Sequence, residues 1–201
     1  MAGVWTRNYS NLLAWQLGSA QNVPNAGNET YSDDNLSFKS CGGNIIKAGG
    51  LQNLSPITFP KLDNLQYRVP NNNYTSTNYY APIICFGTGD TAPSFEDYNI
   101  ESGVSSFTVS QRNIVVSKLH YDSTAHTYST TYRFVLQYTG SPEITLKEMV
   151  IGGTCGVTSP SRDVIIYREV FDTPITVNQY ESIVVELTQA FPIINYEPYP
   201  E

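Results

Sequence analysis

The chain has 201 residues, which fits a single β domain built around one core. Its net charge is -7, and its eleven Lys and Arg residues are scattered singly, which argues against nucleic acid as a partner because phosphate binding needs clustered basic side chains. Charged residues make up 14% of the chain and tyrosines number 15. A surface of phenols, amides and hydroxyls suits contact with another protein or with a glycan.

The cysteine spacing argues against a zinc protein, and the hydropathy argues against a membrane protein. Cys41, Cys85 and Cys155 are far apart, and none stands in a spacing typical of a zinc site, so no metal or other cofactor is expected. Three buried thiols are predicted, and one disulfide with a free thiol stays open as the alternative. No stretch approaches the ~18 apolar residues of a membrane span. The first residues show no signal-peptide pattern, so a soluble protein made in a cytoplasm is expected.

Residues 1–18 are predicted to form an N-terminal helical segment, with the helix itself over 4–17. Its apolar residues recur at the i, i+4, i+7 spacing of one helical stripe. Two tryptophans give this segment more apolar area than a surface helix needs. It either packs on its own β core or docks into a neighbouring subunit. The candidate subunit contacts are Trp5, Tyr9, Leu12 and Trp15.

Residues 19–35 are polar and turn-rich and predict an arm or loop, and residues 36–190 predict a β domain. The clearest strand is 128–138, where apolar and polar residues alternate over eleven positions. Further strands are predicted at 36–40, 43–48, 65–69, 81–86, 113–121, 143–151, 163–171 and 181–188. Short strands separated by turn residues favour a mainly β, antiparallel sandwich with a jelly-roll-like topology.

Residues 191–201 form a proline-rich C-terminal tail with three prolines, two tyrosines and two glutamates. Such a tail is not expected to continue a sheet, because proline lacks the N–H that a ladder needs. It suits an extended segment lying on another surface through Phe191, Tyr196 and Tyr199. A disordered end is the alternative.

No catalytic set is found. His120 and His126 are the only histidines and match no helical metal spacing. Gly153-Thr154-Cys155-Gly156 resembles the nucleophile turn of chymotrypsin-like viral cysteine proteases. Those enzymes need a histidine much earlier in the chain, and none stands in the first half, so this interpretation is rejected. The sequence therefore predicts a protein that is not an enzyme.

Two acidic groups on predicted loops are candidate calcium ligands. They are Asp33-Asp34 and Asp90 with Glu96-Asp97, and neither matches an EF-hand loop. Solvated acidic loops are the favoured interpretation.

Three stretches resemble a known group of proteins. The first reads FGTGDTAPSFEDYNIE (86–101), the second comprises 143–150, 164–177 and 182–187, and the third is Trp5-Thr6-Arg7-Asn8-Tyr9. They resemble segments of uncharacterised structural proteins of tailed-bacteriophage virions. The resemblance implies a structural subunit of the tail, baseplate, collar or capsid surface. It also implies contacts with other virion proteins, a symmetric homo-oligomer, and synthesis in the host bacterial cytoplasm.

The motif residues also have physical interpretations. Gly89 and Pro93 are expected to shape a loop, Asp97 to cap its backbone amides, and Tyr98 to pack beneath it. Pro174 is expected to end the preceding strand.

A second function stays open. The segment 71–80 is rich in Asn, Thr and Tyr and predicts an exposed loop. Tyr74, Tyr79 and Tyr80 could stack on sugars, which suits a carbohydrate- or receptor-binding module of a tail tip or fibre that binds a host-surface glycan.

Overall fold

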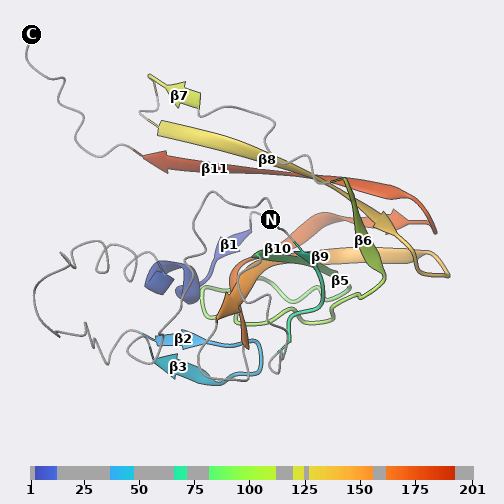
Figure 1. Cartoon of the computed structure of the whole chain (residues 1–201), viewed down its shortest axis with the longest axis horizontal. Helices are drawn as coiled ribbons and strands as arrows, with labels where there is room; N and C mark the ends of the chain where they lie inside the picture. Colours follow the sequence, from blue (N-terminus) through green and yellow to red (C-terminus); the bar gives the residue numbers. More distant parts are fainter. Residues whose placement is uncertain are drawn as a thin grey trace, which may run out of the picture.

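The computed structural model describes residues 3–12, 37–47, 66–71, 82–111, 120–124, 127–155 and 162–192. Within these ranges the protein is mainly β, with eleven strands and a short helical segment at residues 7–12 (Figure 1). Among the described residues, no helix has the length and apolar character needed to cross a membrane.

The larger sheet has five strands in the order β1-β10-β9-β5-β4. Their bounds are β1 (Val4–Trp5), β10 (Arg162–Val177), β9 (Ile144–Cys155), β5 (Pro82–Gly87) and β4 (Gln66–Tyr67). Strand β4 runs parallel to β5, whereas the other pairs are antiparallel. The expectation of purely antiparallel sheets is therefore wrong for this one, which is mixed.

A second sheet has the order β11-β8-β6, with β7 pairing a further part of β8. Its strands are β11 (Ser182–Pro192), β8 (Thr127–Tyr138), β6 (Phe107–Gln111) and β7 (His120–Asp122), all antiparallel. A separate pair joins β2 (Ser37–Lys39) to β3 (Ile45–Lys47). The strands predicted at 36–40, 43–48, 65–69, 81–86, 128–138, 143–151, 163–171 and 181–188 are all found. The last four are longer than predicted, and the first three are shorter within the described residues.

One two-stranded ribbon joins the two sheets. Strand β8 leads into β9, β10 leads into β11, and the two halves pair along most of their length, with register shifts in β10 (Figure 1). At the crossing, the N–H of Tyr138 donates to the carbonyl of Glu181 at 2.9 Å, and the N–H of Tyr180 donates back to the carbonyl of Tyr138 at 2.7 Å. These bonds hold the two halves together at the end of β8, where the ribbon leaves the smaller sheet.

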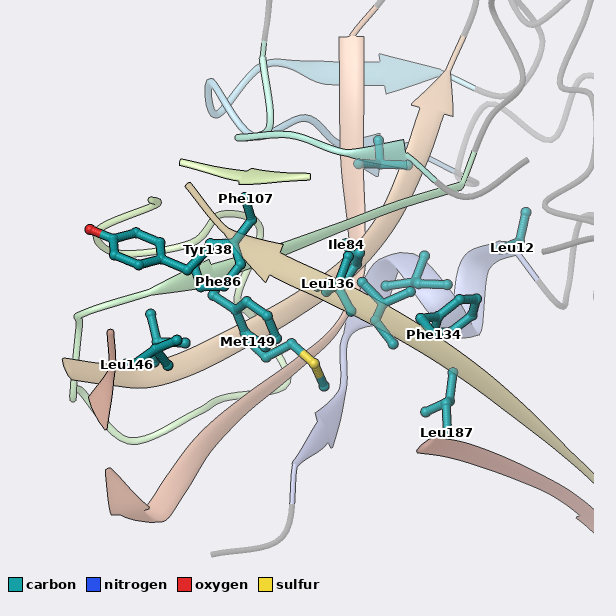
Figure 2. Packing of buried hydrophobic residues seen from close by; sticks show 14 of the residues in the cluster. Leu12, Ile84, Phe86, Phe107, Phe134, Leu136, Tyr138, Leu146, Met149 and Leu187 are labelled. Carbon is teal, nitrogen blue, oxygen red and sulfur yellow. The ribbon is translucent and has the colours of Figure 1, made fainter. Parts of the chain in front are cut away.

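The main core lies between the two sheets. Figure 2 shows Ile84, Phe86 and Met149 of the larger sheet packed with Phe134 and Leu136 of β8. In β8, Phe134, Leu136 and Tyr138 are buried while Arg133 is exposed, as the predicted alternation requires.

The larger sheet is covered on its other face as well. There, Ile83, Cys85, Val150 and Ile165 form a second cluster with Ile100, which belongs to the segment that follows β5. Burial on both faces explains why β5 is apolar at nearly every position. The long segment from 88 to 106 is thus packed against the sheet.

The N-terminal helix prediction over 4–17 is wrong at its start. Val4 and Trp5 are extended and pair with Arg168 and Tyr167 of β10, and the helical residues begin at 7. Valine and tryptophan favour strands, and an available strand edge outweighs the helical spacing. Leu12 is buried in the main core, so in the described part the segment packs on its own chain. The rest of the 1–18 helix and the 19–35 arm lie outside the described residues.

Two boundaries and one strand also differ from the predictions. Pro174 does not end its strand, and β10 continues to Val177. Pro174 lies in the register shift between Val170 and Ile175, where the sheet does not need the N–H that proline lacks. Phe191 and Pro192 pair with Tyr128 and Thr127, so the tail expected from 191 begins after β11. The third difference is strand β6, which was not predicted from the sequence.

Candidate functional site

A buried arginine on β10 lies at the centre of the site. The Arg168 side chain is 4% exposed. Its Nε donates to Oε2 of Glu148 at 3.0 Å, its Nη1 donates to Oδ2 of Asp97 at 2.9 Å, and its Nη2 lies 3.5 Å from Oε2 of Glu101. We call Arg168, Glu148, Asp97 and Glu101 the Arg168 cluster. It connects β9 and β10 to the segment between β5 and β6.

Glu148 is the other buried member of the cluster, with a side chain 0% exposed. Its Oε1 accepts the N–H groups of Gly89 at 3.2 Å and Ser102 at 2.9 Å. Its Oε2 accepts the N–H of Glu101 at 3.2 Å and the Arg168 guanidinium. A carboxylate has about four lone-pair sites, so this one is fully hydrogen-bonded.

The glycines at 87 and 89 permit this arrangement. A Cβ on Gly89 would lie 2.6 Å from Oε1 of Glu148, and one on Gly87 would lie 2.7 Å from the carbonyl of Ser102 and even nearer Glu148. No side chain fits at either position without moving the buried carboxylate. The Gly-Thr-Gly of the resemblance therefore has a steric cause.

Asp97 also organises its own loop. Its Oδ2 accepts the N–H of Ser94 at 2.8 Å as well as the Arg168 guanidinium, so the predicted capping role is confirmed. The ring of Tyr98 lies under the Lys39 ammonium, 3.8 Å from ring centre to Nζ. The loop thereby contacts β2.

The remaining acidic residues of the loop are paired with cations. Asp90 accepts from Lys147 at 2.7 Å, and Oε2 of Glu96 accepts from Nε of Arg7 at 2.9 Å. These hydrogen bonds hold the pKa of both carboxyls below the usual range. Asp90 and Glu96 keep exposed side chains, by 68% and 63%, so the interpretation as solvated acidic loops agrees with the structure for these two residues. Asp97 is only 22% exposed and pairs with Arg168, so it does not fit that interpretation. Asp33 and Asp34 lie outside the described residues.

The Trp-Thr-Arg-Asn-Tyr stretch holds the N-terminal segment in place. Oγ1 of Thr6 donates to the carbonyl of Ile165 at 2.8 Å, and its N–H donates to that of Ile166 at 2.9 Å. The Asn8 amide donates to the carbonyls of Lys39 and Ile165, and its Oδ1 accepts the N–H of Lys39. Thr6 and Asn8 are both buried.

Arg7 then joins this stretch to the loop. Its N–H donates to the carbonyl of Phe95 at 2.7 Å, its guanidinium lies over the Phe95 ring, and it pairs with Glu96. The three segments that carry the resemblance are thus in direct contact, through Arg7 on one side and Arg168 on the other.

A second buried ion pair lies at the start of β10. The guanidinium of Arg68 pairs with the carboxylate of Asp163, whose side chain is fully buried and also accepts the N–H of Asn71 at 2.8 Å. The carbonyl of Asp163 accepts the N–H of Cys41 at 2.9 Å. Asp163 therefore holds three parts of the chain together: the start of β10, residues 66–71 and the turn after β2.

Cys41 and Cys85 are free and buried. Burial raises the pKa of Cys41 to about 11 and that of Cys85 to about 12, so neither is a thiolate near neutral pH. Both agree with the predicted buried thiols. The side chain of Cys155 and all of His126 lie outside the described residues, and His120 is exposed on β7.

The predicted contact residues fall into three groups. Leu12 is buried in the core and Trp5 and Tyr9 are half-buried, with Trp5 stacked on Tyr9 at 4.2 Å between ring centres. Phe191 lies in β11, where only its backbone is described. The others lie outside the described residues: Trp15, Tyr74, Tyr79, Tyr80, Tyr196 and Tyr199.

The Arg168 cluster holds neighbouring segments of the chain together, and its carboxylates are used in those contacts. Within the described ranges, no group of three or more His, Cys, Asp and Glu residues has the geometry to hold a metal ion. Comparisons with protein-family models, curated proteins and solved structures found no match.

Proposed function

We propose that the protein is a non-enzymatic structural subunit of a tailed-phage virion, part of the tail, baseplate, collar or capsid surface. It assembles with other virion proteins and with copies of itself, after synthesis in the host bacterial cytoplasm.

The observation that carries the proposal is the Arg168 cluster. The charged and glycine residues of the resembling segments bond to one another and to backbone amides, chiefly through Glu148 and Arg168. A catalytic carboxylate needs access to a substrate, whereas Glu148 is buried and fully hydrogen-bonded, and Arg168 is buried and paired with it. Residues of this kind fix the shape of a subunit.

We further propose that the two sheets form a sandwich of the jelly-roll type. A jelly roll is an antiparallel ribbon wound so that its paired strands alternate between two sheets. The β8–β9 and β10–β11 ribbon crosses between sheets in this way, and one core lies between them.

Peptide mass spectrometry on purified particles of the encoding phage tests the proposal. The expected result is a fixed, stoichiometric copy number that survives washing in high salt. Absence from particles, or a trace amount that salt removes, would overturn it.

The glycan-binding alternative stays a prediction from the sequence alone. Its residues Tyr74, Tyr79 and Tyr80 lie outside the described part of the chain. Adsorption of particles to cells should fall when all three are replaced with alanine if this alternative holds.

A further inference from the structure

Strand β11 forms one edge of its sheet. It pairs with β8 on one side, and in the described part of the chain nothing pairs with its other side. All eleven of its residues pair with β8 without a register shift. A strand in this position presents a row of N–H and C=O groups that can hydrogen-bond one more strand.

The usual protections of an edge strand are missing from β11. Proteins block such edges with short strands, bulges, lysines or prolines. Strand β11 is long and regular, contains no lysine, and has its one proline at the last residue. Its single charged residue, Glu186, lies 3.8 Å from Arg133 of β8.

The two faces of β11 are clearly different. Ile183, Val185 and Leu187 pack against the core, whereas Val184, Glu186 and Thr188 are exposed, Val184 by 46%. Any added strand must therefore carry the same alternation, with apolar residues on the core side.

We propose that β11 pairs antiparallel with β11 of a second copy of this chain. The two strands are related by a two-fold axis midway between the Leu187 residues of the two copies, which lie directly opposite each other. A second copy supplies a strand of equal length and the same alternation. A two-fold axis perpendicular to the sheet keeps the core side of both copies on one side. The product is a continuous sheet of order β6-β8-β11-β11-β8-β6. This inference deepens the proposed function by naming one partner, and its place in a particle rests on that function.

Two observations fix the register at Leu187. Leu187 is the middle residue of Ser182–Pro192, so an axis there pairs the whole strand. It also sets Glu186 opposite Thr188 of the partner subunit, whose hydroxyl can donate to the carboxylate. Moving the axis to Glu186 would place two glutamates directly opposite each other, which is destabilising.

Two substitutions at one position test the pairing and its register. Thr188→Glu would place a carboxylate opposite Glu186 of the partner subunit, and Thr188→Lys would place an ammonium there. Both remove the 2.7 Å hydrogen bond between the hydroxyls of Thr131 and Thr188, and both substitute an exposed side chain. They therefore differ chiefly in the sign of the charge that they bring to the interface.

Sedimentation velocity over a concentration series measures the dimer dissociation constant of the full chain. The wild type is expected to form a dimer. Thr188→Glu should weaken it about tenfold, since two symmetry-related repulsive pairs form. Thr188→Lys should leave it unchanged or tighten it. Circular dichroism and thermal unfolding confirm that both variants fold.

A wild-type chain that stays monomeric at its highest soluble concentration would overturn the inference. Equal effects of glutamate and lysine would also overturn it, because they exclude Glu186 as the opposing group. Either result leaves the particle copy number untouched, so failure of this inference is distinguishable from failure of the proposed function.

Discussion

The Nε of Arg168 lies 3.0 Å from Oε2 of Glu148, on strands that pair directly and in a place that water does not reach. Val150, directly opposite Arg168, belongs to the cluster that the 88–106 segment covers. The ion pair therefore lies beneath that segment, and both partners extend from the sheet to bind it.

Removing the arginine should destabilise the protein strongly. Arg168→Met keeps much of the apolar stem but leaves Glu148 buried without its cation. We expect a loss of about 3–5 kcal/mol in the free energy of unfolding, the usual cost of breaking a buried pair. Urea unfolding measures it.

The matched control is Arg7→Met, which breaks the exposed pair with Glu96. Solvent screens that pair, so its loss should change stability little. Similar losses in the two variants would show that burial of Arg168 has no energetic consequence.

Gly87→Ala should also destabilise, because the new methyl group would collide with Glu148 and the carbonyl of Ser102. Relieving the collision requires movement of a buried carboxylate or of backbone, and overpacking of this kind costs about 1–3 kcal/mol. Thr88→Ala, between the two glycines, is the control and should be mild. Thermal unfolding of both variants compares them, and equal melting temperatures would contradict the close approach.

Much of the sheet content could be predicted from local sequence. Strand β8 alternates polar and apolar residues, and β5 is a short apolar run, so both follow from periodicity. Strand β1 could not be found, since Trp5 also fits a helical stripe and only the edge of β10 decides between the two. Strand β6 was missed although Phe107 and Val109 alternate with Thr108 and Ser110, which was a usable signal.

The site was predicted in its parts and missed as a whole. The loop and its Asp97 cap follow from Gly, Pro and Asp chemistry. The burial of Glu148 and Arg168 depends on which strands pair, which periodicity does not reveal. One signal was present: Glu148 stands between Leu146 and Val150, and Arg168 stands between Ile166 and Val170, so opposite charges occupy alternate positions whose neighbours are apolar.

The buried thiols should resist modification in the folded protein. In a Cys155→Ser variant, whose remaining thiols are Cys41 and Cys85, Ellman's reagent at pH 8 should react with neither, because the pKa of each lies near 11 or 12. Both should react at once after unfolding in guanidinium. Rapid reaction of either native thiol would show that its burial is incomplete.

The same burial gives stability a pH dependence. The pKa of Cys85 is raised in the folded state from an ordinary value of 9.0, so its stabilising contribution is full below pH 9 and is lost as the pH rises toward about 12. Between pH 8.5 and 10.5 the wild type should therefore lose more stability than Cys85→Ala. Urea titrations at the two pH values measure the difference, and equal losses would exclude the thiol as a cause.

Tyr180 adopts a left-handed backbone conformation, with φ of 68°, in the turn before β11. Its N–H donates to the carbonyl of Tyr138, and its carbonyl accepts from the Gln137 side chain. These two bonds hold the turn, while the residue is 66% exposed. An L-residue with a Cβ loses about 1–2 kcal/mol in this region, and glycine does not. Tyr180→Gly should therefore be more stable than Tyr180→Ala by about 1 kcal/mol, although both remove the same ring and glycine ordinarily destabilises. Thermal unfolding of the two variants side by side decides it: a more stable alanine variant would mean that the backbone at 180 is not left-handed.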